Sequence, residues 1–309
     1  MSIRTFRATD LPRFLLSGSK LGPNWAQTWD KIGTYSNSFS RLSSGAINLV
    51  FRRERMLSSV IIEGGRLKAI ASVRSRSGSK VWEVHFLNLS PELEWGGVEL
   101  IERLCAIAGN HGSQKMFLRL PSTCEIVELA RHAGFLHCVQ ETLYIRESSY
   151  TPDVLTAKFI RPLLSLDEYP VFRLYNECVP SKVKATYAMT FDEWRDSMES
   201  FGGIVQEGVY EDRGSVRGWV RVCYANSAPN LLEIMVHPEE ETCVSEDLLS
   251  WGLKQGRSNA PFQCLMPDYR SNLALVLERK GFIPTGEYCL MVKPIAIRVD
   301  DASLAAVGA

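Results

Sequence analysis

A chain of 309 residues with 45% hydrophobic and 23% charged side chains is globular and long enough for two ordinary domains. Its 35 basic and 35 acidic side chains cancel, so no overall field would attract nucleic acid or an anionic membrane, and we expect neither as a partner. The N-terminus MSIRTFRATD lacks the apolar segment of an export signal, and no apolar run reaches membrane-spanning length.

The eight cysteines are scattered along the chain, without a C-x-x-C pair or a Cys/His cluster at zinc spacing. Three of them, Cys105, Cys223 and Cys289, lie in apolar runs, where a free thiol packs like a small core side chain. These features predict a reduced, cytoplasmic protein without a bound metal.

The first half of the chain predicts alternating strands and helices. Gly64 and Gly65 separate two apolar runs and indicate a hairpin turn. Gly134 follows a helical pattern and suits the C-terminal cap of that helix. The expected strands are 3–8, 60–63, 67–73, 81–89, 115–120 and 141–146, and the expected helices are 10–15, 98–108 and 125–133.

The second half repeats this order of elements. The hairpin at 61–74 has its counterpart at 209–222, and Gly134-Phe135 matches Gly281-Phe282 (281 − 134 = 147). The strands at 143–145 and 290–292 share that offset, which indicates two related domains. We predict an N-terminal domain at 1–147, a linker at 148–157, a C-terminal domain at 158–298 and a disordered tail at 299–309.

The stretch 231–253 predicts a strand, a short loop and a helix in direct succession. The run LLEIMV carries one charge in six residues and suits a mostly buried strand, which Pro238 ends. The unpaired N–H groups of the following helix could hold an anion. Glu239, Glu240 and Glu241 would repel a pyrophosphate there; alternatively, they stabilise the first turn of an ordinary helix through its dipole.

Each half is similar in its order of elements to the GNAT N-acetyltransferase superfamily. The motifs are VWEVHFLNLSPE, VELIERL and ARHAGF in the first half, and RGWVRV, LLEIMVHPE and ERKGFIPTGEYCLMVK in the second. The resemblance covers nearly the whole chain as a tandem pair. It implies two α/β domains with mixed sheets and the transfer of an acetyl group from acetyl-CoA to a small-molecule or peptide amine.

The resemblance also implies that acetyl-CoA lies between two splayed central strands, with its pyrophosphate at the loop that follows. The usual glycine-rich loop motif is missing from both halves, whose two glycine positions hold Trp95 and Gly97, and Glu241 and Cys243. Asn272 could instead cap a helix, and the first-half glycines could instead form a tight turn. The cofactor contacts that the resemblance implies are Met235, Val236, Thr242, Cys243, Val244, Ser245, Asn272, Gly96 and Gly97.

Glu233 is the predicted general base, because it is the only charge in an apolar strand, where burial would raise its pKa. Alternatively, it faces outward. Its first-half counterpart is Glu83 when W-E-V is matched to L-E-I, or Phe86 when the prolines are matched. Ala130 and Leu277 occupy the positions of the family's usual tyrosine. Tyr269 is the predicted acid, and Tyr144 and Tyr288 on the last strands are the alternatives.

Two further groups have open interpretations. Trp25 and Trp29 are four residues apart and would share a helical face, either in the core or at the acceptor site that this region walls in the family. A basic cluster around the first hairpin would be solvated or would contact an acidic substrate or a phosphate. Its members are Arg52, Arg53, Arg55, Arg74 and Arg76.

Two functions remain possible on this sequence. The first is a GNAT-type N-acetyltransferase with at least one active half, the second half being favoured for Glu233 and its intact strand end. The other is a tandem in which both cofactor sites have decayed, leaving a ligand-binding or protein-interaction module. The feature that distinguishes them is whether the central strands splay open or are closed by side chains.

Overall fold

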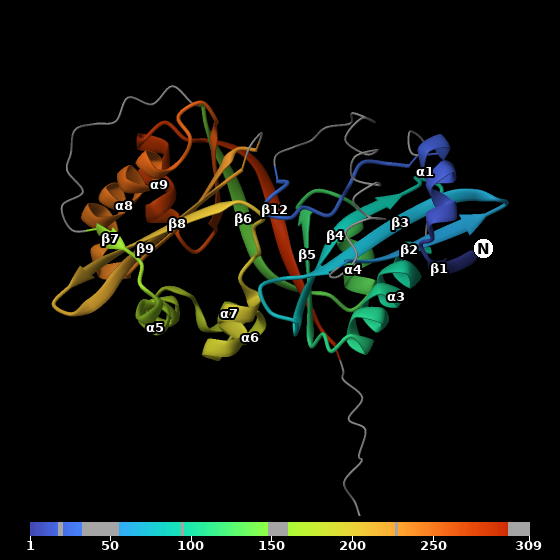
Figure 1. The fold of residues 1–309 in the computed structure, drawn as a ribbon, viewed down its shortest axis with the longest axis horizontal. Helices are drawn as coiled ribbons and strands as arrows, with labels where there is room; N and C mark the ends of the chain where they lie inside the picture. Colours follow the sequence, from blue (N-terminus) through green and yellow to red (C-terminus); the bar gives the residue numbers. More distant parts are fainter. Residues whose placement is uncertain (18–20, 33–55, 94–95, 148–159, 226–227, 296–309) are drawn as a thin grey trace, which may run out of the picture.

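The computed structural model describes residues 1–17, 21–32, 56–93, 96–147, 160–225 and 228–295. The described strands form one mixed sheet of twelve strands that crosses the whole molecule, with helices packed on its faces (Figure 1). The expected class, a mixed α/β fold built from two related halves, is confirmed. None of the helices in these residues is long and apolar enough to cross a membrane.

The first half follows the expected order of elements. Its last strand starts at Leu136 rather than at Glu141, because its ladder with a second-half strand extends back to that residue. The elements are β1 (Ser2–Thr5), η1 (Ala8–Asp10), α1 (Leu11–Ser17), β2 (Met56–Glu63), β3 (Arg66–Ser75), β4 (Val81–Leu89), α3 (Gly96–Asn110), β5 (Lys115–Pro121), α4 (Ile126–His132) and β6 (Leu136–Arg146).

The second half repeats these elements with three helices before its hairpin. They are β7 (Ile160–Pro162), η3 (Ser165–Asp167), α5 (Glu168–Cys178), α6 (Ser181–Tyr187), α7 (Phe191–Ser197), β8 (Ile204–Asp212), β9 (Ser215–Tyr224), β10 (Asn230–Val236), η4 (Pro238–Glu240), α8 (Glu241–Gln255), β11 (Phe262–Pro267), α9 (Ser271–Arg279) and β12 (Ile283–Pro294). Gly134 and Gly281 follow α4 and α9 with φ of 85° and 82°, a left-handed conformation that favours glycine.

The two halves exchange their last strands. The strand order is β1-β2-β3-β4-β5-β12-β6-β11-β10-β9-β8-β7, so β12 pairs with β5 of the first half and β6 pairs with β11 of the second. Figure 1 shows β6 and β12 side by side at the centre. The expected boundary after residue 147 separates the repeats in sequence, but the strands cross it. A site in one half can therefore include residues of the other.

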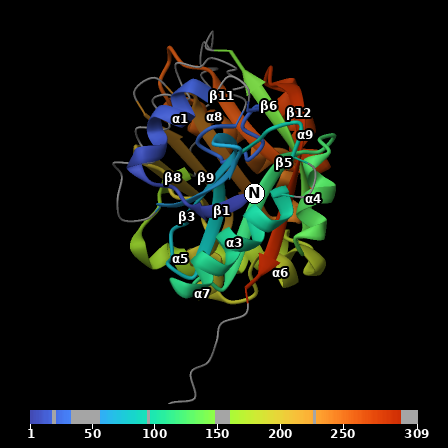
Figure 2. The same ribbon diagram turned by 90° about the vertical axis from the view of Figure 1, so that its right-hand side faces the viewer.

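Side chains alternate between two helical layers, as strand geometry requires. On β10, Leu232, Ile234 and Val236 pack with α8 and α9, whereas Met235 packs with α5 and α7. Glu233 shares the parity of Met235 and therefore faces α5–α7. In the first half, α1 and α3 lie on opposite faces of the strands (Figure 2).

The expectation that Trp25 and Trp29 share a helical face is wrong. Residues 22–28 form an extended segment without helix. Its main chain pairs with β4 and β5 instead of with itself. A four-residue spacing indicates a helix only where the backbone is free to form one.

Candidate active site

The central strands of the second half separate part-way along their length. Parallel pairing of β10 with β11 runs only from Asn230–Phe262 to Leu232–Cys264, although the strands continue to Val236 and Pro267. In the first half, β4 and β5 separate after the Glu83–Phe117 pair. The central strands therefore separate in both halves. This separation is the feature expected to distinguish an active transferase from a decayed tandem.

The first-half opening is occupied by residues 22–27 of the same chain, which we call the plug segment. Its N–H groups donate to strand carbonyls on both sides: Gly22 to Leu89 (3.1 Å), Trp25 to Leu87 (2.9 Å) and Gln27 to Arg119 (2.9 Å). The Asn24 side chain accepts a hydrogen bond from the Leu87 N–H at 2.8 Å. The plug segment therefore satisfies strand groups with which an added strand or a ligand would pair.

Replacing Asn24 with alanine is expected to lower the free energy of unfolding by about 1–3 kcal/mol, because the Leu87 N–H loses its acceptor. Urea denaturation measures the change. Asn259, an exposed residue, supplies the control, since Asn259→Ala should stay within about 0.5 kcal/mol of the parent. Equal stability of the two variants would mean that the Asn24 side chain contributes no net energy.

Gly96 and Gly97 lie at the start of α3, where packing accounts for them. A Cβ on Gly96 would lie 2.9 Å from Leu93 Cδ1, and one on Gly97 2.9 Å from Leu129 Cδ1. A cavity of about 460 Å³, the first-half cavity, borders this turn beside Trp25. Among the described residues that line it, none is Lys or Arg, so its chemistry is poor for a pyrophosphate.

A smaller cavity of about 130 Å³, the second-half cavity, lies at the opening between β10 and β11. Its walls come from those two strands, from the α5–α7 region and from the first half, which contributes Trp29, Arg119, Val139 and Glu141. The exchange of β6 and β12 brings these first-half residues to it. This cavity is therefore a composite of both halves.

Glu233 lines the second-half cavity, so it is not the outward-facing residue of the alternative interpretation. It lies opposite Arg221 on β9. Within the described part of the chain, its carboxylate makes no hydrogen bond or ion pair. Burial raises the pKa of Glu233 above its ordinary value of 4.5, and the charges of Arg221 and Arg270 only partly offset that effect.

Tyr269 lines the same cavity, from the loop between β11 and α9. Burial raises the pKa of its phenol, so the hydroxyl holds its proton at neutral pH. In the described residues no hydrogen bond engages that hydroxyl. The structure thus brings the two predicted catalytic residues to one cavity.

No family model matches the sequence, and no curated protein matches it. Solved structures match over nearly the whole chain. A GCN5-related N-acetyltransferase from Sphaerobacter thermophilus is 14% identical, with a TM-score of 0.58 and 97% of each chain covered. A tandem GNAT protein from the clavulanic acid biosynthesis pathway is 13% identical, with a TM-score of 0.54 and 96% of this chain and 98% of that chain covered.

The chain has a tandem GNAT fold. A putative acetyltransferase from Pyrococcus horikoshii also matches, at 12% identity and a TM-score of 0.52, over 97% of this chain and 92% of that one. Identities this low establish the fold alone, and activity has to be argued from the site.

The two halves of this fold differ in their central-strand carboxylate. Glu83 lies opposite Arg74 on β3, as Glu233 lies opposite Arg221 on β9, which favours Glu83 over Phe86 as the counterpart. Glu83 is buried and bonded to Arg74 Nε at 2.7 Å and to Arg76 Nε at 3.0 Å. Its lone pairs are held by fixed cations, so it is poorly placed to accept a substrate proton.

The predicted cofactor residues of the second half take different positions. Met235 lines the second-half cavity. Val236 and Val244 instead belong to the hydrophobic core between β10 and α8. Ser245 is buried in α8, and Thr242 and Cys243 belong to its first turn. Asn272 is exposed in the first turn of α9, where Arg270 holds the cap position, so Asn272 does not cap the helix.

The loop after β10 uses its polar groups internally. The N–H groups of His237 and Glu240 donate to Arg217 O and His237 O, both at 2.9 Å, and the Glu239 N–H donates to His237 Nδ1 at 3.3 Å. Arg217 also pairs with Glu239 at 2.8 Å and with Glu240 at 3.5 Å. These three N–H groups are therefore not free for a pyrophosphate.

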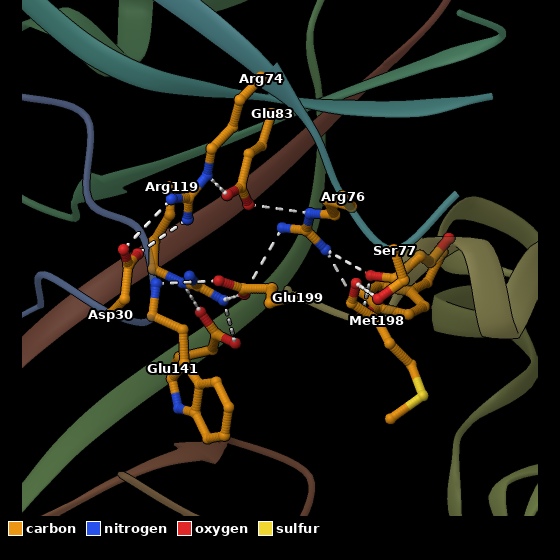
Figure 3. A network of polar contacts seen from close by, with 12 residues as sticks. Asp30, Arg74, Arg76, Ser77, Glu83, Arg119, Glu141, Met198 and Glu199 are labelled. Atoms are coloured by element: carbon orange, nitrogen blue, oxygen red, sulfur yellow. Dashed lines mark hydrogen bonds and ion pairs between the residues drawn. The ribbon is translucent and has the colours of Figure 1, made fainter. Parts of the chain in front are cut away.

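A buried ion network joins the halves and was not predicted (Figure 3). Arg119 bonds to Glu141 at 2.6 Å and to Glu199 at 2.7 Å, and Arg76 lies 3.5 Å from Glu199. Glu199 also accepts the Trp29 N–H at 2.8 Å. The expectation of a solvated basic face at Arg76 is wrong, since its side chain is 1% exposed.

The other members of that basic cluster divide in two. Arg74 is bonded to Asp30 and Glu83, so it also belongs to the network rather than to a solvated face. Arg52, Arg53 and Arg55 lie outside the described residues. The sequence did contain a signal for this network. Arg119 lies in the apolar strand KMFLRLP, and a buried arginine requires a carboxylate partner.

Glu199 should make folding sensitive to acid. Burial alone would raise its pKa, but the charges of Arg119 and Arg76 outweigh burial and lower the pKa to about 2. A folded-state pKa below the ordinary 4.5 contributes stability above pH 4.5 that is lost as the pH falls towards 2. We expect the stability difference between the parent and Glu199→Gln to shrink between about pH 6 and about pH 2 in urea denaturation. A constant difference would contradict the lowered pKa.

Proposed function

We propose that the protein is a GNAT-type acyltransferase that moves an acetyl group from acetyl-CoA to an amine, and that the second half carries the activity. The observation that supports this most is the pair Glu233 and Tyr269 at one cavity beside the β10–β11 opening. The first half offers no equivalent, because the plug segment fills its opening and Glu83 is held by two arginines.

Each residue has one step in the proposed transfer. Glu233 accepts a proton from the amine nitrogen as that nitrogen attacks the thioester carbonyl carbon. The C–N bond forms and the C–S bond breaks, and Tyr269 donates its proton to the departing thiolate. The proton gained by Glu233 balances the one lost by Tyr269, and exchange with water restores both.

The fit of acetyl-CoA is uneven. The edge of β10 beyond Leu232 is free of β11, which suits the pantetheine arm along Met235 and Val236. The loop after β10 suits the pyrophosphate poorly, because its N–H groups and Arg217 are engaged. In this proposal the arm along β10 therefore supplies more of the affinity than the loop does.

A second candidate is a ligand-binding tandem without transfer activity. Arg270 Nη1 donates to Ile234 O at 2.6 Å, at the strand edge where a pantetheine arm would pair. Together with the self-satisfied acidic loop, this contact favours a pocket that binds a ligand but no acyl donor. The two candidates differ in whether acetyl-CoA binds.

Titration calorimetry of acetyl-CoA into the full chain tests the proposal. We expect micromolar binding, about −8 kcal/mol, that is lost in Met235→Trp, whose larger side chain fills the second-half cavity. The matched control is Val98→Trp in the first-half cavity, which should leave the affinity unchanged. No heat at millimolar acetyl-CoA would rule out the transferase and favour the ligand-binding tandem. Loss of binding in Val98→Trp alone would assign the donor to the first half.

A further inference from the structure

The first-half cavity has the size of a small-molecule binding site. At about 460 Å³ it lies within the roughly 300–1,000 Å³ that is common for ligand pockets. Its walls come from the plug segment, from the end of β4 and the turn that follows, and from α3 and α4. Among the described residues, it shares no lining residue with the second-half cavity, so it is a separate site.

Four large apolar side chains line this cavity without being fully buried: Trp25, Leu93, Val98 and Leu129. Each packs against the first-half core, but part of its surface stays exposed to solvent. Covering apolar surface that water reaches is favourable in proportion to the covered area. The cavity therefore holds apolar surface that the chain leaves open and that an apolar molecule would cover.

Two polar groups of the lining have no hydrogen-bond partner in the described part of the chain. They are the indole Nε1 of Trp25 and the hydroxyl of Ser90. Nε1 lies next to Gly22, another lining residue, whose position for a Cβ is 3.7 Å away. An indole N–H can only donate, and a hydroxyl can donate as well as accept. An oxygen acceptor on a ligand would supply the partner that both donors lack.

The main chain holds these two donors in place. The Trp25 N–H donates to Leu87 O at 2.9 Å, which ties the plug segment to β4 beside the indole. The Ser90 N–H donates to Lys68 O at 2.8 Å, and Ser90 O accepts from the Leu93 N–H at 2.9 Å. Donors that the scaffold already orders cost less conformational entropy when a ligand binds, so the site is preorganised.

The charges around the first-half cavity favour a neutral occupant. Lys or Arg is absent from its described lining, and Lys68, on the neighbouring strand, is paired with Glu92. The lining carboxylate, Glu125, is exposed at the N-terminal cap of α4, where the helix dipole stabilises it. His132 donates from Nδ1 to Glu128 O at 2.8 Å. The described lining thus offers no buried charge to compensate an ionic group on a ligand.

From these observations we infer that the first-half cavity binds an uncharged small molecule with an apolar body and an oxygen acceptor, such as a carbonyl, for Trp25 Nε1 and Ser90 Oγ. This chemistry differs from that of a nucleotide cofactor, because the described lining has no cation for a phosphate and the plug segment occupies the strand groups. The inference goes beyond the proposed transfer and does not depend on it, because the two cavities are separate.

A fluorescent ketone tests the inference. We would titrate the full chain with 6-propionyl-2-(dimethylamino)naphthalene, a neutral apolar ketone whose emission moves to shorter wavelength in an apolar site. Its 6-propyl analogue has the same shape without the carbonyl, and 6-(dimethylamino)naphthalene-2-carboxylate carries a negative charge. The ketone is expected to bind saturably, and the carboxylate at least about tenfold more weakly, because its charge would lose hydration without a compensating cation.

Matched variants locate the site and identify its donors. Val98→Trp, whose larger side chain fills the first-half cavity, should abolish ketone binding, whereas Met235→Trp in the second-half cavity should leave it unchanged. Trp25→Phe and Ser90→Ala each remove one donor, so each should weaken the ketone about fivefold and leave the 6-propyl analogue within about twofold. The thermal midpoint of each variant shows whether it is folded, and the donor variants keep the test decisive if Val98→Trp is not.

Several results would overturn the inference. They are a lack of saturable ketone binding, ketone binding that survives in folded Val98→Trp, and a carboxylate that binds as tightly as the ketone. Equal weakening of the ketone and the 6-propyl analogue in both donor variants would also overturn it, because the donors would then act only through packing. Displacement of the ketone by acetyl-CoA would assign the cavity to the acyl donor instead. The proposed function is decided separately, by acetyl-CoA binding and its loss in Met235→Trp.

Discussion

Glu233→Gln is expected to lower kcat/KM for acetyl transfer about 10²–10⁴-fold while the affinity for acetyl-CoA stays within twofold of the parent. Glutamine matches glutamate in size but cannot accept the amine proton. The carboxylate faces the α5–α7 side of β10 and lines the second-half cavity, so the substitution removes a proton acceptor without opening a void. Release of the CoA thiol measures the rate, and titration calorimetry measures the donor affinity.

The pH dependence strengthens this test. Because burial raises the pKa of Glu233 above 4.5, its proton-free form is lost on acidification at a higher pH than for an ordinary glutamate. The acid limb of kcat/KM should therefore lie above pH 4.5 in the parent and be absent in Glu233→Gln. Glu246→Gln, on the surface of α8, should keep both rate and limb. A glutamine variant with at least half of the parent rate would exclude Glu233 as the base.

The features that the sequence predicted correctly are those that depend on neighbouring residues in the chain. The left-handed glycines after α4 and α9 and the two hairpins follow from local conformational preference, and the offset that the glycines share with the last strands revealed the repeat. Glu233 stood out in the same way, as one charge in an apolar strand; its place at the cavity is observed, and its role as the base stays a prediction. Such patterns can be recognised from neighbouring residues, without knowing which distant segment packs against them.

The features that the sequence missed depend on contacts between distant segments. β6 and β12 have similar apolar patterns, and nothing in either strand specifies that each pairs with the other half's penultimate strand. The plug segment carries no strand pattern of its own, because its pairing is fixed by β4 and β5. Glu199 lies in the polar run DEWRDSMES, where the sequence predicts a solvent-exposed carboxylate.

Glu199→Ala is expected to lower the free energy of unfolding by about 3–5 kcal/mol, measured by urea denaturation. The substitution leaves Arg76 and Arg119 buried with one carboxylate fewer between them, and it removes the acceptor of the Trp29 N–H. Asp192→Ala is the matched control, because it removes an exposed carboxylate that pairs with Arg195 on α7 and should cost less than about 1 kcal/mol.

The same substitution separates the stability of the network from its effect on the site. Glu199 holds the main chain of Trp29, which lines the second-half cavity, so Glu199→Ala should also weaken amine binding under conditions where the variant is folded. Glu141→Ala removes the other carboxylate of Arg119 without touching Trp29. It should lower stability by a comparable amount and weaken the amine less. Because both carboxylates line the cavity, equal effects of the two variants on amine binding would mean that the Glu199–Trp29 contact adds nothing further.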